Sequence, residues 1–124
     1  MRHEKNDAAY LQDMVTAGEA VERYIAGKSR TDYDRDEILQ DALMRRIEIF
    51  GEAARRLSST LLANHPEIPW RKIMGTRHIL AHDYDEIDLD IVWRIATEHI
   101  PESLVHLRKL VPPPPAFPTE ETQR

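Results

Sequence analysis

Hydrophobic residues recur every three or four positions along most of the chain, which is the spacing of an α-helix that buries one face. Four helical segments are predicted from this pattern, at about residues 7–26, 36–63, 70–81 and 88–110. No segment shows the strict alternation of hydrophobic and polar residues that is typical of a half-buried strand. The pattern therefore predicts an all-α fold, an antiparallel bundle of four to five helices.

Glycine and proline mark the breaks between these segments. Gly27 ends the first segment, and residues 29–34 form a polar connection. Residues 65–69 contain two prolines and predict a stop followed by a new helix start at Pro69 or Trp70. Pro101 lies inside the last segment and should kink or split it near residues 97–99.

Four consecutive prolines begin at residue 112 and predict a stiff, extended exit from the bundle. The polar residues after them favour a disordered end. We therefore expect a helical domain over residues 1–111 and a proline-rich tail over residues 112–124. The predicted second helix, 28 residues over 36–63, would be about 42 Å long. Its long hydrophobic seam suggests burial against a second copy of the chain, hence a homodimer.

Composition narrows the class of protein. The 124 residues correspond to one domain with a modest core. The chain has no cysteine, which excludes disulfides and thiolate metal sites. No apolar run approaches the roughly 20 residues of a membrane span, and no signal peptide is evident at the amino terminus. We expect a cytoplasmic protein without a membrane partner.

The net charge of −5 argues against a general nucleic-acid or DNA coat protein. Residues 44–82, however, hold seven Arg or Lys against three acids, which makes this segment about +4 and the remainder about −9. A local basic surface on an acidic body fits a specific RNA contact and a separate protein partner. The alternative is a solvated helix face with ion pairs four residues apart, such as Glu52 with Arg56.

The most informative residues are Arg77, His82 and Tyr84. Cleavage of RNA without a metal needs a base for the 2′-hydroxyl, a stabiliser of the pentacoordinate phosphate and an acid for the leaving oxygen. Histidine can serve as acid or base near neutral pH, and arginine offers fixed donors to phosphate oxygens. Arg77 also falls on the hydrophobic stripe of its predicted helix, where a cation is costly unless it is paired or faces a polar cleft.

Five residues along a continuous helix place Arg77 and His82 about 140° apart, so one subunit makes a poor complete site. Two subunits related by a two-fold axis could bring both pairs into one cleft. The alternative is that Arg77 pairs with an acid inside the bundle and that His82 is an ordinary exposed residue.

The stretch GTRHILAHDY at residues 75–84 resembles the signature of the HEPN superfamily, and more narrowly that of HepT-type toxins of the DUF86 branch, whose motif is R-x4-H-x-Y. Three flanking segments resemble the same family in order, and the likeness extends over roughly residues 5–110. These segments are the second-helix run at 49–57, the connector at 65–70 and the last-helix entry at 88–93.

The resemblance implies an all-helical homodimer that acts as a metal-independent endoribonuclease and as the toxin of a toxin–antitoxin pair. Arg77 and His82 fall on the family's catalytic arginine and histidine, and transfer RNA is a candidate substrate. Tyr84 falls on the tyrosine that a minimal nucleotidyltransferase antitoxin modifies with AMP from ATP. Such AMPylation adds bulk and negative charge beside His82, and both oppose RNA binding.

His78 stands where this branch often has asparagine, and it is an auxiliary candidate together with the nearby Asp83. Two alternatives remain open at this stage. His78 and His82, with Asp83 and Asp85 close by, have a spacing that can hold a divalent metal, although no clear third ligand stands out. The chain could also be a non-catalytic helical module that binds a nucleotidyltransferase or a nucleotide. The nuclease hypothesis itself requires neither a metal nor a cofactor.

Overall fold

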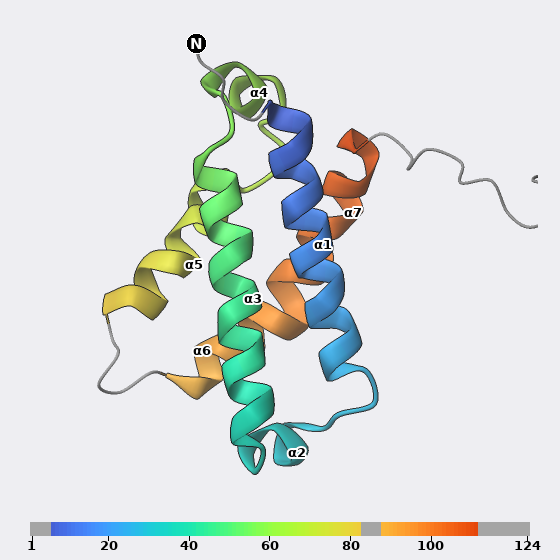
Figure 1. Ribbon diagram of the computed structural model, residues 1–124, viewed down its shortest axis with the longest axis vertical. Helices are drawn as coiled ribbons and strands as arrows, with labels where there is room; N and C mark the ends of the chain where they lie inside the picture. Colours follow the sequence, from blue (N-terminus) through green and yellow to red (C-terminus); the bar gives the residue numbers. More distant parts are fainter. Residues whose placement is uncertain (1–5, 83–87, 112–124) are drawn as a thin grey trace, which may run out of the picture.

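The computed structural model describes residues 6–82 and 88–111, with residues 77–82 described by their backbone alone. Long helical segments run alternately down and up the bundle, so neighbours along the chain are antiparallel (Figure 1). These segments are α1 (Asp7–Ile25), α3 (Glu37–Arg55), α5 (Trp70–His82) and the succession α6 (Leu89–Arg94), η1 (Ile95–His99) and α7 (Ile100–Leu110). The all-α antiparallel bundle predicted from the sequence is confirmed.

The first helix begins and ends where the sequence predicts. The side chain of Asn6 accepts a hydrogen bond from the backbone N–H of Ala9 at 3.0 Å and thereby caps α1. Gly27 follows the helix with φ of +73°, a left-handed conformation that glycine adopts without the steric cost of a side chain. The chain can therefore turn sharply away from α1 at this point.

The predicted second helix over residues 36–63 is wrong in its length. It is divided into α3 and a separate short helix, α4 (Ser59–Asn64). The cause is Ser58, whose hydroxyl accepts from the Leu61 N–H at 3.1 Å and so caps a new helix. Asp7 holds Ser58 in place by accepting from its N–H at 2.8 Å and from its hydroxyl at 2.6 Å. The 19 residues of α3 span about 28 Å, so helix length no longer argues for a dimer.

The polar connection at residues 29–34 also contains a helix, α2 (Arg30–Asp34). A capping box forms it: the Ser29 hydroxyl accepts from the Asp32 N–H, and the Asp32 carboxylate accepts from the Ser29 N–H. The turn buries Tyr33 completely. The segment predicted as a polar connection thus contributes an aromatic residue to the core.

The last helical segment bends at the position that the sequence predicts. Pro101 has no N–H, and its ring would clash with the carbonyl of Thr97 in a regular α-helix. The backbone adapts by widening into η1, a π-helical turn in which the Ile100 N–H donates to the Ile95 carbonyl, five residues earlier. The helical path continues through η1 into α7.

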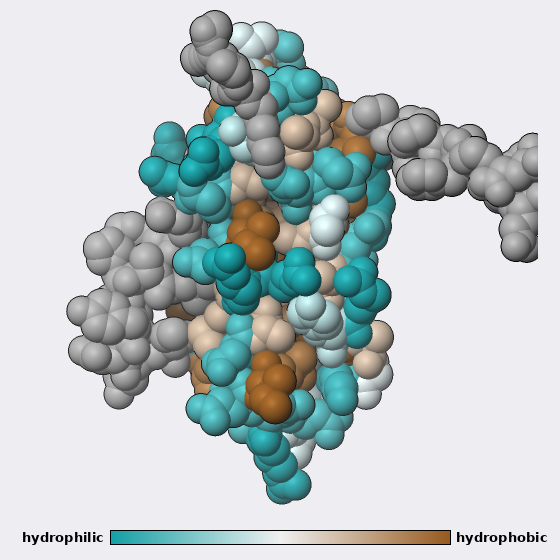
Figure 2. All heavy atoms as spheres, viewed as in Figure 1, coloured by the Kyte–Doolittle hydropathy of each residue, from teal (hydrophilic) through white to brown (hydrophobic). Residues whose placement is uncertain are grey.

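The core lies between the long helices and is made of aliphatic residues, with Tyr33, Phe50 and Trp70 as its buried aromatic residues. α1 and α3 pack most extensively on one another, while α5 packs on α3 and α7 packs on α1. On the face drawn in Figure 2, strongly hydrophobic side chains are exposed as separate spots among hydrophilic ones. Within the described ranges, no helix is long and apolar enough to span a membrane.

Candidate active site

The predicted catalytic positions lie on α5 and just beyond it. α5 is helical from Trp70 to His82, so Arg77, His78 and His82 occupy its last turns. Asp83 and Tyr84 lie outside the described residues. The structure thus places three of the five candidate positions on one uninterrupted helix.

This continuity fixes the angular relation between the two main candidates. At 100° per residue, positions 77 and 82 are about 140° apart around the axis, whereas positions 78 and 82 share a face. The separation predicted from spacing therefore applies to the folded chain. One subunit holds Arg77 and His82 on different faces of the helix, which keeps the two-subunit site a prediction.

The first half of α5 is anchored firmly. The indole N–H of Trp70 donates to the His65 carbonyl at 2.9 Å and fixes the helix to the preceding connector. Ile73 is buried, and the Thr76 hydroxyl donates to the Ile73 carbonyl at 2.7 Å. Position 77 therefore follows directly on a helical stretch that is held against α3 (Figure 1).

The chain is anchored again immediately after residues 83–87. The Asp88 carboxylate accepts from the N–H groups of Asp90 and Ile91 at 2.9 and 3.3 Å and caps α6. Tyr33 of α2 donates its hydroxyl hydrogen to the Leu89 carbonyl at 2.9 Å. Its ring lies 4.8 Å from that of Trp93, centroid to centroid. The chain is thus anchored to the bundle through Thr76 of α5 and again from Asp88 onward.

Ion pairs strengthen the second of these anchors. Arg30 of α2 pairs with Asp34 at 2.7 Å and with Asp90 in the first turn of α6. The guanidinium also lies 5.7 Å from the centre of the Tyr33 ring. Burial raises the pKa of Tyr33 to about 12, so its hydroxyl keeps the proton that it donates. We call Arg30, Tyr33, Leu89, Asp90 and Trp93 the α2–α6 clasp.

The α2–α6 clasp was not predicted from the sequence, because residues 29–34 have no hydrophobic periodicity. A local signal was available, since Ser29 and Asp32 have the spacing of a capping box and Tyr33 follows at once. The partner of Tyr33 lies 56 residues further on and could not be identified from that signal.

Part of the basic segment forms ordinary surface ion pairs. Arg45 pairs with Glu48 at 3.0 Å, and Arg56 pairs with Glu52 at 3.3 Å, as the alternative interpretation of the charges predicts. All four residues line a groove of about 550 Å³ that also includes Tyr10 and Asp13 of α1. A hydrogen bond with Tyr10, followed by the charge of Glu52, raises the pKa of Arg56. This groove carries charges of both signs and offers no distinct anion site.

The cations of α5 are arranged differently. Arg71 and Lys72 are exposed, and neither forms an ion pair with any residue in the described part of the chain. Lys72 borders a small cavity that also includes Thr76, the residue before Arg77. Arg71 and Lys72 thus place positive charge on the helix that carries the motif, although Arg55 of α3 likewise forms no ion pair within the described residues.

The described residues contain no group of three or more His, Asp or Glu placed to hold a metal ion. The proposed ligands of the metal alternative, the side chains of His78, His82, Asp83 and Asp85, lie outside what the structure describes.

The chain is similar to known proteins that are named as ribonucleases. A family model described as ribonuclease HepT-like matches residues 14–110. A protein of Thermococcus cleftensis named "Probable ribonuclease HepT" is 34% identical over 82% of this chain and 92% of its own length. A protein of Caldanaerobacter subterraneus subsp. tengcongensis named "Putative RNase" is 32% identical over 79% of this chain and 88% of its own.

A protein of Methanocaldococcus jannaschii named "Gamma-glutamylcyclotransferase and putative RNase" is 32% identical over 86% of this chain. The match covers only 48% of that relative, so this chain spans about half of its length. No solved structure gives a significant match.

Proposed function

The chain belongs to the ribonuclease HepT-like family, and from this membership we propose that it is a metal-independent endoribonuclease in which Arg77 and His82 are the catalytic residues. The observation that carries the proposal is their placement, five residues apart on one continuous helix, in a chain that the family model matches over residues 14–110. The names of two relatives that cover most of this chain also refer to ribonuclease activity.

The proposed reaction follows from the two side chains. A histidine near neutral pH can take the proton of the 2′-hydroxyl, whose oxygen then attacks the neighbouring phosphorus. The guanidinium of Arg77 stabilises the extra negative charge of the pentacoordinate phosphate through paired N–H donors. The P–O bond to the 5′-oxygen breaks, and a protonated histidine returns a proton to that oxygen. The products are a 2′,3′-cyclic phosphate and a 5′-hydroxyl.

In the proposed composite site, the arginine comes from one subunit and the histidine from the other. A homodimer supplies His82 twice and Arg77 twice around its two-fold axis. The 140° separation on α5 supports this arrangement, because a helix of one subunit cannot present both positions to one phosphate. The homodimer is therefore part of the proposal.

We further propose that this ribonuclease is the toxin of a cytoplasmic toxin–antitoxin pair. Its antitoxin would be a minimal nucleotidyltransferase that transfers AMP from ATP to the Tyr84 hydroxyl and releases pyrophosphate. The phosphodiester so formed carries a negative charge two residues from His82, where it repels RNA phosphates and occupies space. His78 and Asp83 are proposed as auxiliary residues, and transfer RNA as the substrate.

The direct test measures cleavage of RNA by the purified protein in the presence of a chelator. The proposal predicts cleavage by the parent protein, cyclic-phosphate ends on the fragments, and no cleavage of a DNA of the same sequence. Arg77→Ala and His82→Ala should each lose activity, and Lys109→Ala, in the last turn of α7 at the end of the bundle away from α2 (Figure 1), is the control. A His82→Ala protein that cleaves as fast as the parent would show that the assignment is wrong.

The second candidate is a non-catalytic module that binds a nucleotidyltransferase or a nucleotide. It predicts that the parent protein binds the antitoxin but leaves RNA intact at every protein concentration. A metallohydrolase, by contrast, would cleave RNA only when a divalent metal is present. Parallel assays in chelator and in added divalent metal therefore separate all three functions.

Modification is tested by intact mass after co-expression with the antitoxin. The parent should gain the mass of one or more AMP units and lose ribonuclease activity. Tyr84→Phe should gain none, and Tyr24→Phe serves as a matched tyrosine control because Tyr24 lies in α1. If Tyr84→Phe gains the same mass as the parent, another residue is the acceptor.

A further inference from the structure

A small cavity lies where α3, α5 and the η1–α7 turn meet. Aliphatic and aromatic side chains form its floor, and its polar lining residues are Lys72, Thr76, His99, Glu102 and Ser103. Its volume of about 30 Å³ is enough for one or two water molecules but not for a nucleobase. The cavity can therefore take a single oxygen-bearing group, while the rest of a ligand lies across its rim.

Ser103 gives the clearest sign that the cavity takes a polar group. Its residue is only 3% exposed, yet its hydroxyl makes no hydrogen bond to any residue that the structure describes. Thr76 differs, because its hydroxyl donates to the Ile73 carbonyl. The Ser103 hydroxyl is not among the fully buried polar atoms that lack a partner in the described residues, so it is open to the cavity and can bond to an oxygen that enters it.

Two nitrogen-bearing side chains reach the same cavity from different elements. Lys72 comes from α5, and His99 comes from the last position of η1. Neither forms an ion pair within the described ranges. The π-turn matters here because its extra residue rotates His99 relative to a regular α-helix, and such turns are often found at functional sites. Pro101 is the physical cause of that turn.

Glu102 adds a carboxylate to the same rim. A bare phosphate would be repelled by this group, whereas a ribose hydroxyl could donate a hydrogen bond to it. The rim thus combines an ammonium, an imidazole and a hydroxyl with one acceptor of a hydrogen bond. This mixture matches a sugar joined to a phosphate better than it matches an isolated anion.

The position of the cavity connects it to the motif. Thr76 immediately precedes Arg77, and Lys72 lies five residues before it on the same helix, a rise of about 7.5 Å. We propose that the cavity and its rim form a subsite for one ribose-phosphate unit of RNA, next to the scissile linkage. This inference rests on the proposed ribonuclease function and adds the residues that hold the substrate backbone.

Each side chain has a distinct task in the subsite. The Lys72 ammonium and a His99 N–H contact phosphate oxygens, and the Ser103 hydroxyl donates to the oxygen that enters the cavity. The Glu102 carboxylate accepts a hydrogen bond from the 2′-hydroxyl, the group that distinguishes RNA from DNA. These are positioning and binding roles, because the bond-breaking groups remain Arg77 and His82.

The test measures binding of a fluorescent single-stranded RNA by anisotropy, in a His82→Ala background so that the RNA stays intact. Lys72→Ala should weaken binding about tenfold, as expected for one charge-assisted hydrogen bond. The same substitution should make the plot of the logarithm of the association constant against the logarithm of the salt concentration less steep by about 0.7. This is the value for one phosphate contact on a single strand. Ser103→Ala should weaken binding several-fold without altering that slope.

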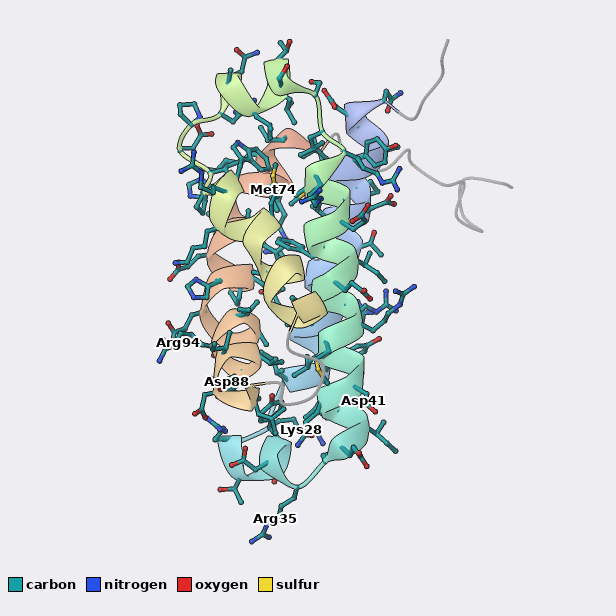
Figure 3. The ribbon with its side chains drawn as sticks, turned by 90° about the vertical axis from the view of Figure 1, so that its left-hand side faces the viewer. Lys28, Arg35, Asp41, Met74, Asp88 and Arg94 are labelled. Atoms are coloured by element: carbon teal, nitrogen blue, oxygen red, sulfur yellow. The ribbon has the colours of Figure 1, made fainter. Side chains whose placement is uncertain are left out.

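Two controls separate the subsite from overall charge and from misfolding. Lys28→Ala removes the same charge far from the cavity and should leave RNA binding unchanged. Figure 3 shows Lys28 at the opposite end of the bundle from Met74, which is the neighbour of the cavity residue Ile73. Glu102→Gln should reduce the preference for RNA over DNA of the same sequence. Circular dichroism and thermal melting identify any variant that has not folded.

The outcomes distinguish the subsite from the proposed function. If the parent protein cleaves RNA but Lys72→Ala and Ser103→Ala bind like Lys28→Ala, the subsite is wrong and the nuclease stands. If the parent cleaves no RNA yet Lys72→Ala selectively weakens RNA binding, the nuclease proposal fails while the binding subsite is supported. If Lys72→Ala and Lys28→Ala weaken RNA binding equally, the effect comes from the net charge of the protein alone, and the subsite proposal is wrong.

Discussion

The Tyr33 hydroxyl donates a hydrogen bond of 2.9 Å to the backbone carbonyl of Leu89, across 56 residues of sequence. This bond joins the short helix α2 to the first residue of α6, and the Tyr33 ring lies against Trp93 one turn further on. The contact fixes the chain directly after the segment that carries Tyr84. A residue far from the motif in sequence thus holds the start of α6 in place.

Removal of this hydroxyl should cost measurable stability. Tyr33→Phe keeps the buried ring but leaves the Leu89 carbonyl without its donor, which predicts a loss of about 1 kcal/mol in the free energy of unfolding. Tyr24→Phe is the matched control, because Tyr24 is only partly buried and accepts a hydrogen bond from Arg46 at 3.2 Å. Urea denaturation measures the change in the free energy of unfolding for both variants. Equal effects of the two substitutions would contradict a special role for the Tyr33–Leu89 bond.

The raised pKa of Tyr33 predicts a dependence of stability on alkaline pH. The folded protein holds the phenol proton up to a pKa of about 12, whereas the unfolded chain releases it near 10. The contribution of Tyr33 is therefore complete below pH 10 and is lost as pH rises through 12. Denaturation at pH 9, 10 and 11 should show a steeper fall for the parent than for Tyr33→Phe. If the free energy of unfolding falls equally with pH in the two proteins, the ionisation of Tyr33 does not contribute to stability.

The cap of α6 gives a second stability prediction. The Asp88 carboxylate accepts from two backbone N–H groups, so Asp88→Ala should destabilise the protein by about 1 kcal/mol. Asp88→Asn retains a capping oxygen and should cost much less. Thermal melts of the three proteins make the comparison. A loss as large for Asn as for Ala would mean that charge, and not capping, dominates at this position.

Two helical glycines should respond differently to alanine. A Cβ at Gly75 would meet nothing within 4 Å, so Gly75→Ala should stabilise α5 by up to about 1 kcal/mol. A Cβ at Gly18 would lie 2.8 Å from a methyl group of Leu104, which is fully buried. Gly18→Ala should therefore be less stable than Gly75→Ala by about 1 to 3 kcal/mol. The reverse order in chemical denaturation would contradict the packing described for α1 and α7.

The long helices could be predicted from sequence because each buries a hydrophobic stripe. The first and third segments, the Asp88 cap and the bend before Pro101 all agree with the structure. The division of residues 36–63 could not be predicted from periodicity, because the hydrophobic spacing continues through Leu57 and Leu61. A hydrogen-bonded contact between Asp7 and Ser58 decides it, and that contact joins residues 51 positions apart.

Likewise, one part of the candidate site could be predicted from the sequence and another part could not. The motif residues were found from their spacing and their resemblance to a family, and the helical backbone through His82 agrees with that spacing. The α2–α6 clasp and the cavity at Lys72 and Ser103 depend on contacts between distant elements. Local patterns carry little information about such contacts. The roles of Arg77, His82 and Tyr84 stay predictions.

In the proposed active site, Arg77 of one subunit and His82 of the other act on one phosphate. Arg77→Ala and His82→Ala should each be inactive alone, and co-expression of the two, with separate affinity tags, yields the mixed dimer. A shared cleft predicts that RNA cleavage in chelator returns in the mixed dimer to a substantial fraction of the parent rate, because it retains one Arg77 and one His82. A mixed dimer as inactive as its two parents would contradict the composite site.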